Sequence, residues 1–175
     1  EAPEPYDVRW FVNRWPAMPD DRCEVVLYSP RHDASFWSLG VDGVTSVIDL
    51  WAERTAALGG RDGIASVLVF ENRGPQVGAT IAHPHGQIYA FDRITPVEAR
   101  ELTRAGADGC ALCPPPDDLL VVNDGLGWRA WVPEAAAWPY ELLLAPLAHH
   151  PDLPSLDADA RRGLATSLVA VLSRL

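Results

Sequence analysis

Basic side chains are scarce in this sequence. Its 175 residues include 24 aspartates and glutamates but only 14 lysines and arginines, so the formal net charge at pH 7 is −10. A surface that binds nucleic acid broadly is basic, because binding is driven by the release of counterions from phosphates. We therefore expect no nucleic-acid partner. Any anionic ligand has to be held locally, by a few arginines, by backbone N–H groups or by a metal ion.

Long apolar runs and cysteines are also few. No run approaches the roughly 18 apolar residues that span a bilayer, and no charged-then-apolar leader opens the sequence, so we expect no membrane partner. Of the three cysteines, Cys110 and Cys113 form a C-x-x-C pair, which favours metal ligands or reduced thiols over a disulfide framework. These absences indicate a cytoplasmic protein. The sequence also lacks an initial methionine and stops inside an apolar helical pattern, so we expect a piece of something longer.

Apolar residues make up 48% of the sequence, enough for one well-packed core of ordinary size. Residues rich in β-branched and aromatic side chains predict strands over 8–13, 23–28, 66–72 and 86–91. Between the second and the third strand, apolar residues recur at helical spacing over 42–58, which predicts an amphipathic helix. This order predicts an α+β fold, with a mainly antiparallel sheet and a packed helix.

The second part of the sequence resembles the first. After the C-x-x-C pair, it predicts two tryptophan-bearing strands and a helix from about residue 157. We interpret the sequence as a first unit over 1–104 and the beginning of a second over 105–175. Chance similarity between two strand-loop-helix units is the alternative. A shift of about 117 residues pairs Glu24 with Glu141, Leu27 with Leu144, His32 with His149 and Leu39 with Leu156.

The motif from His83 to Gln87, HPHGQ, has the residues for phosphorus chemistry. If the chain stays extended through Pro84, the side chains of His83, His85 and Gln87 point to one side. A neutral imidazole can attack phosphorus and form a covalent intermediate. Gly86 would let a phosphate approach the backbone, and Gln87 offers amide donors to a phosphate oxygen without being a useful acid. The other imidazole is free to bind a metal.

The stretch "FENRGPQVGATIAHPHGQIYA" resembles the active-site signature of the galactose-1-phosphate uridylyltransferase family, part of the histidine-triad superfamily. "NRWPAM", "EVVLYSPRH" and "WPYELLLAP" resemble other segments of that family, so the resemblance covers nearly the whole sequence. It implies a histidine-triad fold, with one near-complete repeat and part of a second. It also implies an enzyme of galactose metabolism, which moves uridylyl between UDP-glucose or UDP-galactose and hexose 1-phosphates through a uridylyl-histidine.

The resemblance also implies roles for particular residues. It makes His85 the nucleophile. Gln87 takes the place where histidine-triad hydrolases keep a third histidine, which implies transfer rather than hydrolysis. Taken singly, the other matched residues are also ordinary turn residues or surface charges. Besides Gln87, contacts with the substrate are implied for Asn13, Arg14, Asn72, Gly78 and Thr80.

A zinc site is implied as well. Many members of the family hold zinc on two cysteines of an upstream C-x-x-C and on two histidines that match His32 and His83 here. The upstream cysteine pair is missing from this sequence. Two ligands do not make a four-coordinate structural zinc site. We therefore expect weak zinc binding, unless Cys23 or another chain supplies ligands.

A second metal site is predicted by Cys110, Cys113 and His149. The repeat alignment places His149 at the position of His32, and a C-x-x-C pair with a histidine gives three of the four ligands of a tetrahedral site. A reduced cysteine pair without metal is the alternative.

The resemblance leaves several alternatives open. The family works as a dimer, so we expect a homodimer or a complementing chain, and this chain alone is either inactive or in need of such a partner. The enzymatic rival is a sister histidine-triad nucleotide phosphorylase or adenylyltransferase. The rival from another class is a non-catalytic fragment that complements a partner.

Overall fold

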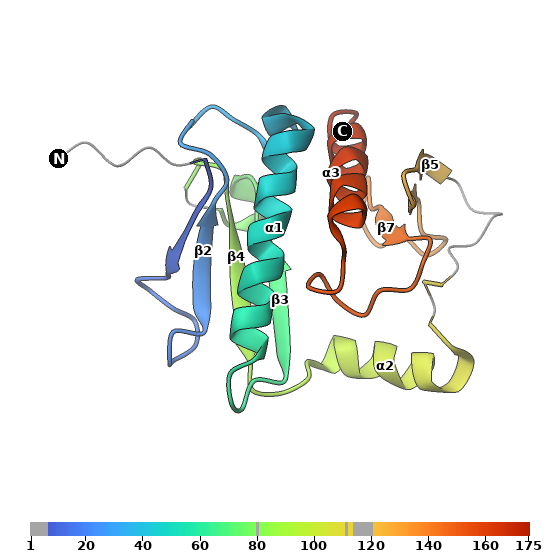
Figure 1. The fold of residues 1–175 in the computed structure, drawn as a ribbon, viewed down its shortest axis with the longest axis horizontal. Helices are drawn as coiled ribbons and strands as arrows, with labels where there is room; N and C mark the ends of the chain where they lie inside the picture. Colours follow the sequence, from blue (N-terminus) through green and yellow to red (C-terminus); the bar gives the residue numbers. More distant parts are fainter. Residues whose placement is uncertain (1–6, 80, 111, 114–120) are drawn as a thin grey trace.

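The computed structural model describes residues 7–79, 81–110, 112–113 and 121–175, and for residues 106–108 and 123–124 the backbone alone. Two antiparallel sheets with packed helices confirm the predicted α+β fold (Figure 1). The elements, in chain order, are β1 (Arg9–Val12), β2 (Cys23–Leu27), the 3-10 helix η1 (Phe36–Leu39), α1 (Gly40–Gly59), β3 (Ser66–Phe70), the 3-10 helix η2 (Pro75–Val77), β4 (His85–Phe91), α2 (Pro96–Asp108), β5 (Val121–Gly125), β6 (Trp128–Trp131), β7 (Leu143–Pro146) and α3 (Ala158–Leu172).

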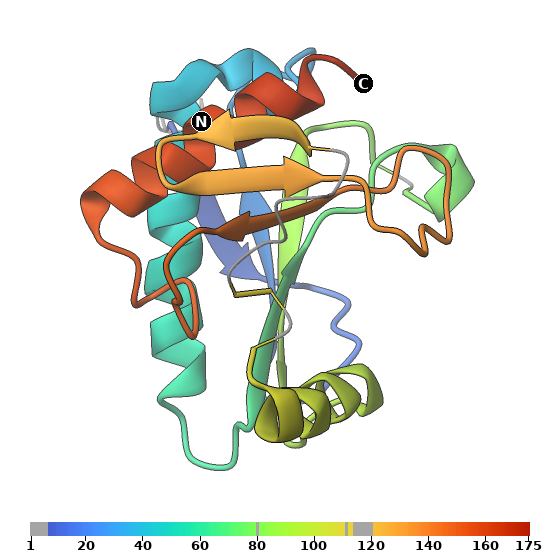
Figure 2. The ribbon, with the colours of Figure 1, turned by 90° about the vertical axis from the view of Figure 1, so that its right-hand side faces the viewer.

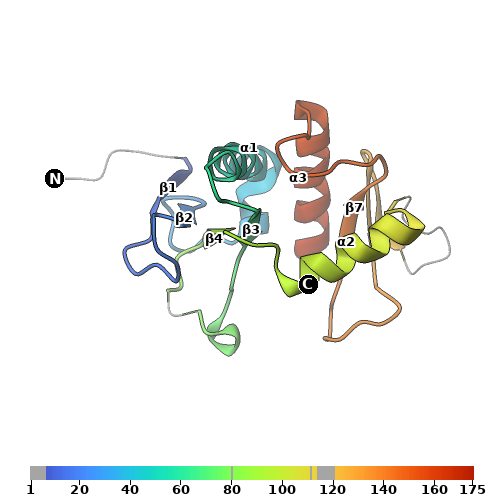
Figure 3. The ribbon, with the colours of Figure 1, turned by 90° about the horizontal axis from the view of Figure 1, so that it is seen from below.

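The first sheet positions the HPHGQ motif. Its strand order is β1-β2-β4-β3, with every neighbouring pair antiparallel. α1 covers one face of this sheet (Figure 3). Side chains alternate between the faces of a strand, so Gly86 and Ile88 of β4 are buried on the helix side. His85 and Gln87 are half-buried and share the opposite face.

A buried ion pair fixes α1 on the first sheet. Glu24 of β2 is 2% exposed and accepts two hydrogen bonds from the guanidinium of Arg54 in α1, at 2.8 and 2.9 Å. The same guanidinium lies 3.6 Å from the ring centroid of Trp10. The repeat alignment pairs Glu141 with Glu24, but Glu141 makes local hydrogen bonds with the backbone. Its carboxylate accepts the backbone N–H groups of the loop before β7.

The second sheet differs from the expectation of two tryptophan-bearing strands. It has three strands in the order β5-β6-β7, and both Trp128 and Trp131 lie in β6. β5 and β6 form a hairpin whose turn residues Leu126 and Gly127 have φ angles of 52° and 78°. Two positive φ angles define a type I′ turn, for which leucine is an unusual residue. The turn therefore has no clear signal in the sequence.

The two sheets join through their helices. α1 and α3 lie side by side (Figure 1), and one hydrophobic core includes buried residues of both halves. In each half, a hairpin leads into a loop with a histidine and then into a helix, which is the order that the repeat alignment implies. The division between residues 104 and 105 stays a prediction. Within the described ranges, no helix is long and apolar enough to cross a membrane.

Candidate active site

His85 opens β4, and one hydrogen bond sets its tautomer. Its Nδ1 lies 2.7 Å from the backbone carbonyl oxygen of His83. A carbonyl can only accept, so Nδ1 carries the hydrogen and donates it. In the neutral ring, the lone pair is then on Nε2. The backbone of the HPH motif thus presents the imidazole in the form that a nucleophile needs.

Gln87 lies two residues further along β4, on the same face as His85. Its Oε1 accepts a hydrogen bond from the Tyr89 hydroxyl at 3.2 Å. With this oxygen engaged, the amide nitrogen is the end of Gln87 that can donate to a phosphate oxygen. The sequence-based prediction for Gln87 is compatible with this orientation.

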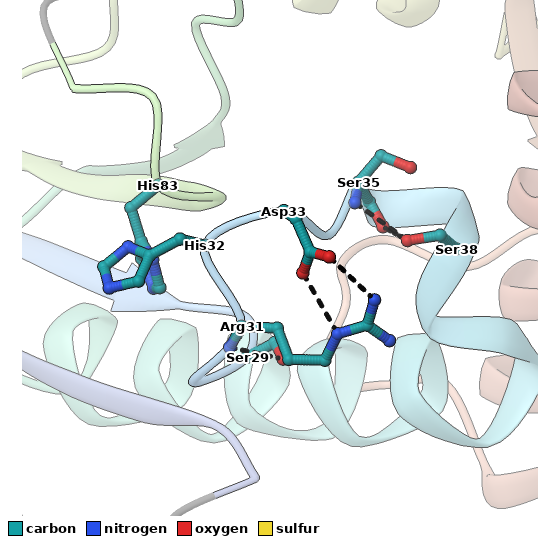
Figure 4. A network of polar contacts seen from close by, with 7 residues as sticks. All are labelled: Ser29, Arg31, His32, Asp33, Ser35, Ser38 and His83. Atoms are coloured by element: carbon teal, nitrogen blue, oxygen red, sulfur yellow. Dashed lines mark hydrogen bonds and ion pairs between the residues drawn. The ribbon is translucent and has the colours of Figure 1, made fainter.

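His83 does not continue the strand, which begins at His85. Its ring instead turns toward His32, in the loop that follows β2 (Figure 4). The two Nδ1 atoms are 2.8 Å apart, and the ring centroids are 4.5 Å apart at an interplanar angle of 70°. Burial, and then the neighbouring His32, lowers the pKa of His83. Two imidazoles with converging nitrogens are a fit arrangement for a shared metal ion.

The loop that carries His32 is braced by its own side chains (Figure 4). The Arg31 guanidinium donates to both carboxylate oxygens of Asp33, at 3.2 and 3.3 Å. The Ser35 N–H donates to the Ser38 hydroxyl, which donates back to the Ser35 carbonyl, at 2.8 and 2.9 Å. These local bonds order the exposed loop in which His32 faces His83.

A cleft of about 50 Å³ lies beside His85. Of the predicted substrate residues, Asn72 lines it, together with both histidines of the HPH motif. The sequence analysis missed Glu71 and Arg73, which line the same cleft and directly flank Asn72. Their position in the quoted FENRG segment was the available signal.

The other predicted substrate residues that the structure describes lie outside the lining of this cleft. Asn13 follows β1, and its Oδ1 accepts the Trp15 N–H at 2.9 Å, so the side chain closes a local turn. The guanidinium of Arg14 lies 5.2 Å from the Trp15 ring centroid. Gly78 ends η2 with a left-handed φ of 80°, and Thr80 lies outside the described residues.

A larger hollow of about 390 Å³ lies between the second sheet and the end of α3. It is lined mainly by apolar side chains, among them Val132, Trp138 and Val171. None of the predicted site residues that the structure describes lines it. We therefore place the candidate active site at the smaller cleft, where the chemistry-bearing residues meet.

Cys110, Cys113 and His149 do come together. Their ligand atoms all lie within 4.8 Å of one another, and Cys113 Sγ is 3.4 Å from His149 Nδ1. The Cys113 N–H donates to the Cys110 carbonyl at 3.1 Å, which closes the C-x-x-C turn. Burial, followed by the neighbouring Cys110, raises the pKa of the Cys113 thiol. Two sulfurs and an imidazole are a donor set that fits zinc.

Residues 15–95 match the family model for the galactose-1-phosphate uridyl transferase N-terminal domain. A galactose-1-phosphate uridylyltransferase of Streptomyces lividans is 41% identical over 168 residues, which cover 89% of this chain and 48% of that protein. The chain is a relative of the galactose-1-phosphate uridylyltransferases. It spans about half the length of the curated relatives it matches.

The fold of the uridylyltransferases is also shared. A solved uridylyltransferase structure, 25% identical in sequence, superposes with a TM-score of 0.84 over 93% of this chain and 61% of that chain. An ADP-glucose phosphorylase from Arabidopsis thaliana with bound ADP-glucose has a TM-score of 0.89 at 22% identity, over 96% of this chain and 59% of that one. The second likeness concerns the fold alone.

Proposed function

We propose that this chain carries the nucleophile of a uridylyltransferase that exchanges uridylyl between UDP-glucose and galactose 1-phosphate, and that His85 is this nucleophile. The observation that carries the proposal is the Nδ1–H···O=C bond between His85 and His83, because it selects the neutral tautomer whose lone pair is on Nε2. The relatives named as galactose-1-phosphate uridylyltransferases support the choice of substrates.

The reaction has two displacements. His85 Nε2 attacks the α-phosphorus of UDP-glucose; the P–N bond forms, and the P–O bond to glucose 1-phosphate breaks with its electron pair on the leaving phosphate. A phosphate oxygen of galactose 1-phosphate then attacks the same phosphorus and releases His85. The Gln87 amide donates to a non-bridging oxygen in both steps. Neither displacement needs a proton transfer, and the Gln87 amide cannot take up the proton that an attacking water would have to lose.

The remaining predicted contacts are part of the same proposal. Asn72 lies nearest to this chemistry, because it lines the cleft beside His85. Contacts of Asn13, Arg14, Gly78 and Thr80 with the UDP-sugar are proposed from the resemblance to the family. Cytoplasmic location and assembly with a second copy or a complementing chain stay predictions.

The test is covalent labelling of the purified chain with UDP-glucose, alone and together with a truncated partner chain that complements it, followed by peptide mapping. We expect a uridylyl phosphoramidate on His85 that hexose 1-phosphate removes, and no label on His85→Asn. His150→Asn is the matched control, since His150 has no assigned role. Label from ADP-glucose alone would favour the sister adenylyltransferase. No label from either donor, with equal complementation of a truncated partner by wild type and His85→Asn, would favour the non-catalytic fragment.

We also propose two zinc positions. His32 and His83 would supply two ligands of one ion, and the converging Nδ1 atoms support this. Cys110, Cys113 and His149 would supply three ligands of a second ion. When bound, such an ion cross-links the chain segments that hold it.

Cobalt substitution tests the cysteine site. Thiolate ligands give bound cobalt(II) a sulfur-to-metal charge-transfer band, which we expect in the wild type and not in Cys113→Ser. Cys23→Ala is the control, because Cys23 is buried in the first sheet and should leave the band in place. Cobalt bound without this band would show that the cysteines are a reduced pair and not ligands.

A further inference from the structure

Tyr28 is a buried residue next to the candidate active site. It follows β2 directly and is 2% exposed. Its ring makes edge contacts with Phe36 and Trp51, at centroid distances of 5.1 and 5.8 Å, and these two rings stack on each other. Its N–H donates to the carbonyl of Pro84 at 3.2 Å. The aromatic cluster therefore fixes the ring beneath the HPH motif.

The Tyr28 hydroxyl reaches the strand between the two proposed catalytic residues. A Cβ atom built on Gly86 would lie 2.1 Å from the hydroxyl oxygen, so the hydroxyl occupies the space of the missing side chain. Gly86 faces the buried side of β4, so its role differs from the predicted one of admitting a phosphate. The hydroxyl is buried and makes no hydrogen bond of good geometry within the described part of the chain. A buried hydroxyl without a partner is costly.

The group that can satisfy this hydroxyl is Glu71. It follows β3 and lines the same cleft as His85. Burial, and then the nearby Glu71 carboxylate, raises the pKa of Tyr28 far above its usual value. Burial raises the pKa of Glu71, while the charges of Arg73 and His85 and the Tyr28 hydroxyl favour its ionised form. Tyr28, Glu71 and His85 are thus neighbours around one strand end.

We propose that Glu71, held by the Tyr28 hydroxyl, is a positioning residue that stabilises the charge His85 acquires when it carries a nucleotidyl group. This assignment rests on the proposed function. When Nε2 gives its lone pair to phosphorus, the Nδ1 hydrogen stays on the ring, bonded to the His83 carbonyl. The ring then carries a formal positive charge, and no proton has moved. A carboxylate beside the ring favours this state, since opposite charges attract strongly in a partly buried site.

The test follows the rate of nucleotidyl-His85 formation from UDP-glucose in single-turnover experiments. For Glu71→Gln we expect a rate about tenfold lower, with an unchanged half-saturating concentration of UDP-glucose. Tyr28→Phe keeps the ring and loses only the hydroxyl. For this variant we expect a rate of nucleotidyl-His85 formation about threefold lower than that of the wild type. The double variant should react no more slowly than Glu71→Gln, because the hydroxyl acts through the carboxylate.

The controls separate this assignment from a structural role and from the proposed function. Glu134→Gln changes an exposed glutamate of the second half and should react like the wild type. The assignment would be overturned if the lower rate of Glu71→Gln came only from weaker binding of UDP-glucose. It would also be overturned if the effects of the two substitutions on the rate were additive in the double variant. Labelling at the wild-type rate in both single variants would overturn it too. A wild type that never labels His85 would overturn the proposed function, and this assignment with it.

Discussion

At Gly86 the space for a side chain is already filled. A Cβ there would meet the Tyr28 hydroxyl and ring, and would lie 3.2 Å from the Phe70 carbonyl. Because both neighbours are packed, Gly86→Ala should lower the free energy of unfolding by about 1–3 kcal/mol, the usual cost of overpacking. Urea unfolding measures this loss.

Two further variants check why Gly86→Ala should lower the free energy of unfolding. Gly125→Ala is the control, because nothing lies within 4 Å of its added Cβ, and it should change stability by less than about 0.5 kcal/mol. Combining Gly86→Ala with Tyr28→Phe should restore part of the loss, since the nearest clashing atom is then absent. If the loss in Gly86→Ala is the same with and without the hydroxyl, the steric explanation is wrong.

Residues within one segment could be predicted from the sequence, and residues that meet across segments could not. The HPHGQ spacing placed His85 and Gln87 on one face, which the alternation along β4 confirms. The Tyr28 hydroxyl lies beneath Gly86 only because β2 and β4 pair with Val26 opposite Gly86. That register is a tertiary property, so neither Tyr28 nor Glu71 was recognised.

At the scale of the element, α2 shows how local bonds hold a helix that has little tertiary packing. It lies below the two sheets (Figure 2), and large apolar residues such as Val97 and Leu102 are exposed on it. The periodicity of apolar residues predicted α1 and α3, whereas none of the α2 side chains that the structure describes is buried, and its sequence is mostly polar. Its start is instead defined by a capping box between Thr95 and Glu98.

The Glu98 carboxylate joins this capping box to the first sheet. It accepts the Ser66 hydroxyl at 2.6 Å and the Thr95 N–H at 2.9 Å. We expect Glu98→Ala to lower the free energy of unfolding by about 1 kcal/mol at pH 7, the usual value of a helix cap. Glu101→Ala, an exposed glutamate on the same helix, should have little effect.

The contribution of Glu98 should depend on pH. The Ser66 hydroxyl, and then the Thr95 N–H, holds the pKa of the Glu98 carboxyl below its usual value. The folded pKa is thus lower than the unfolded one, so the stabilisation is complete above the unfolded pKa and is lost as pH falls through the folded pKa. The difference between wild type and Glu98→Ala should therefore shrink below about pH 4. A difference that stays constant down to pH 3 would contradict this explanation.

At the scale of the whole molecule, the two halves share one core. Tyr28, Val47 and Ile88 of the first half belong to the same buried cluster as Trp128 and Leu164 of the second. The ion pairs between α1 and α3 contribute less to stability than this shared core does. Arg162 and Asp42, 2.9 Å apart, are 58% and 90% exposed, and pairs at such exposure contribute little.

The repeat in the sequence predicted two similar units, but it could not predict how they join. The joint depends on close contacts that no single segment reveals. Gly163 of α3 has the carbonyl of Leu126 only 2.4 Å from its Cβ position, so the helix packs directly on the β5–β6 turn. The Trp128 indole N–H then donates to the Ala160 carbonyl at 2.9 Å. These contacts fix α3 between its own sheet and α1.

A shared core means that the halves should unfold together. Leu164 is 7% exposed in α3, and Leu164→Ala should lower the free energy of unfolding by about 2–5 kcal/mol through the cavity that it leaves. Hydrogen exchange followed by mass spectrometry shows which amides lose protection in this variant. We expect the amides of β2 and β4 to lose as much protection as those of β6, although Leu164 lies in the other half. Leu102→Ala, at an exposed position of α2, should leave both halves unchanged. Loss of protection confined to β6 and α3 would show instead that the halves are independent folding units, with α1 and α3 in contact but not energetically coupled.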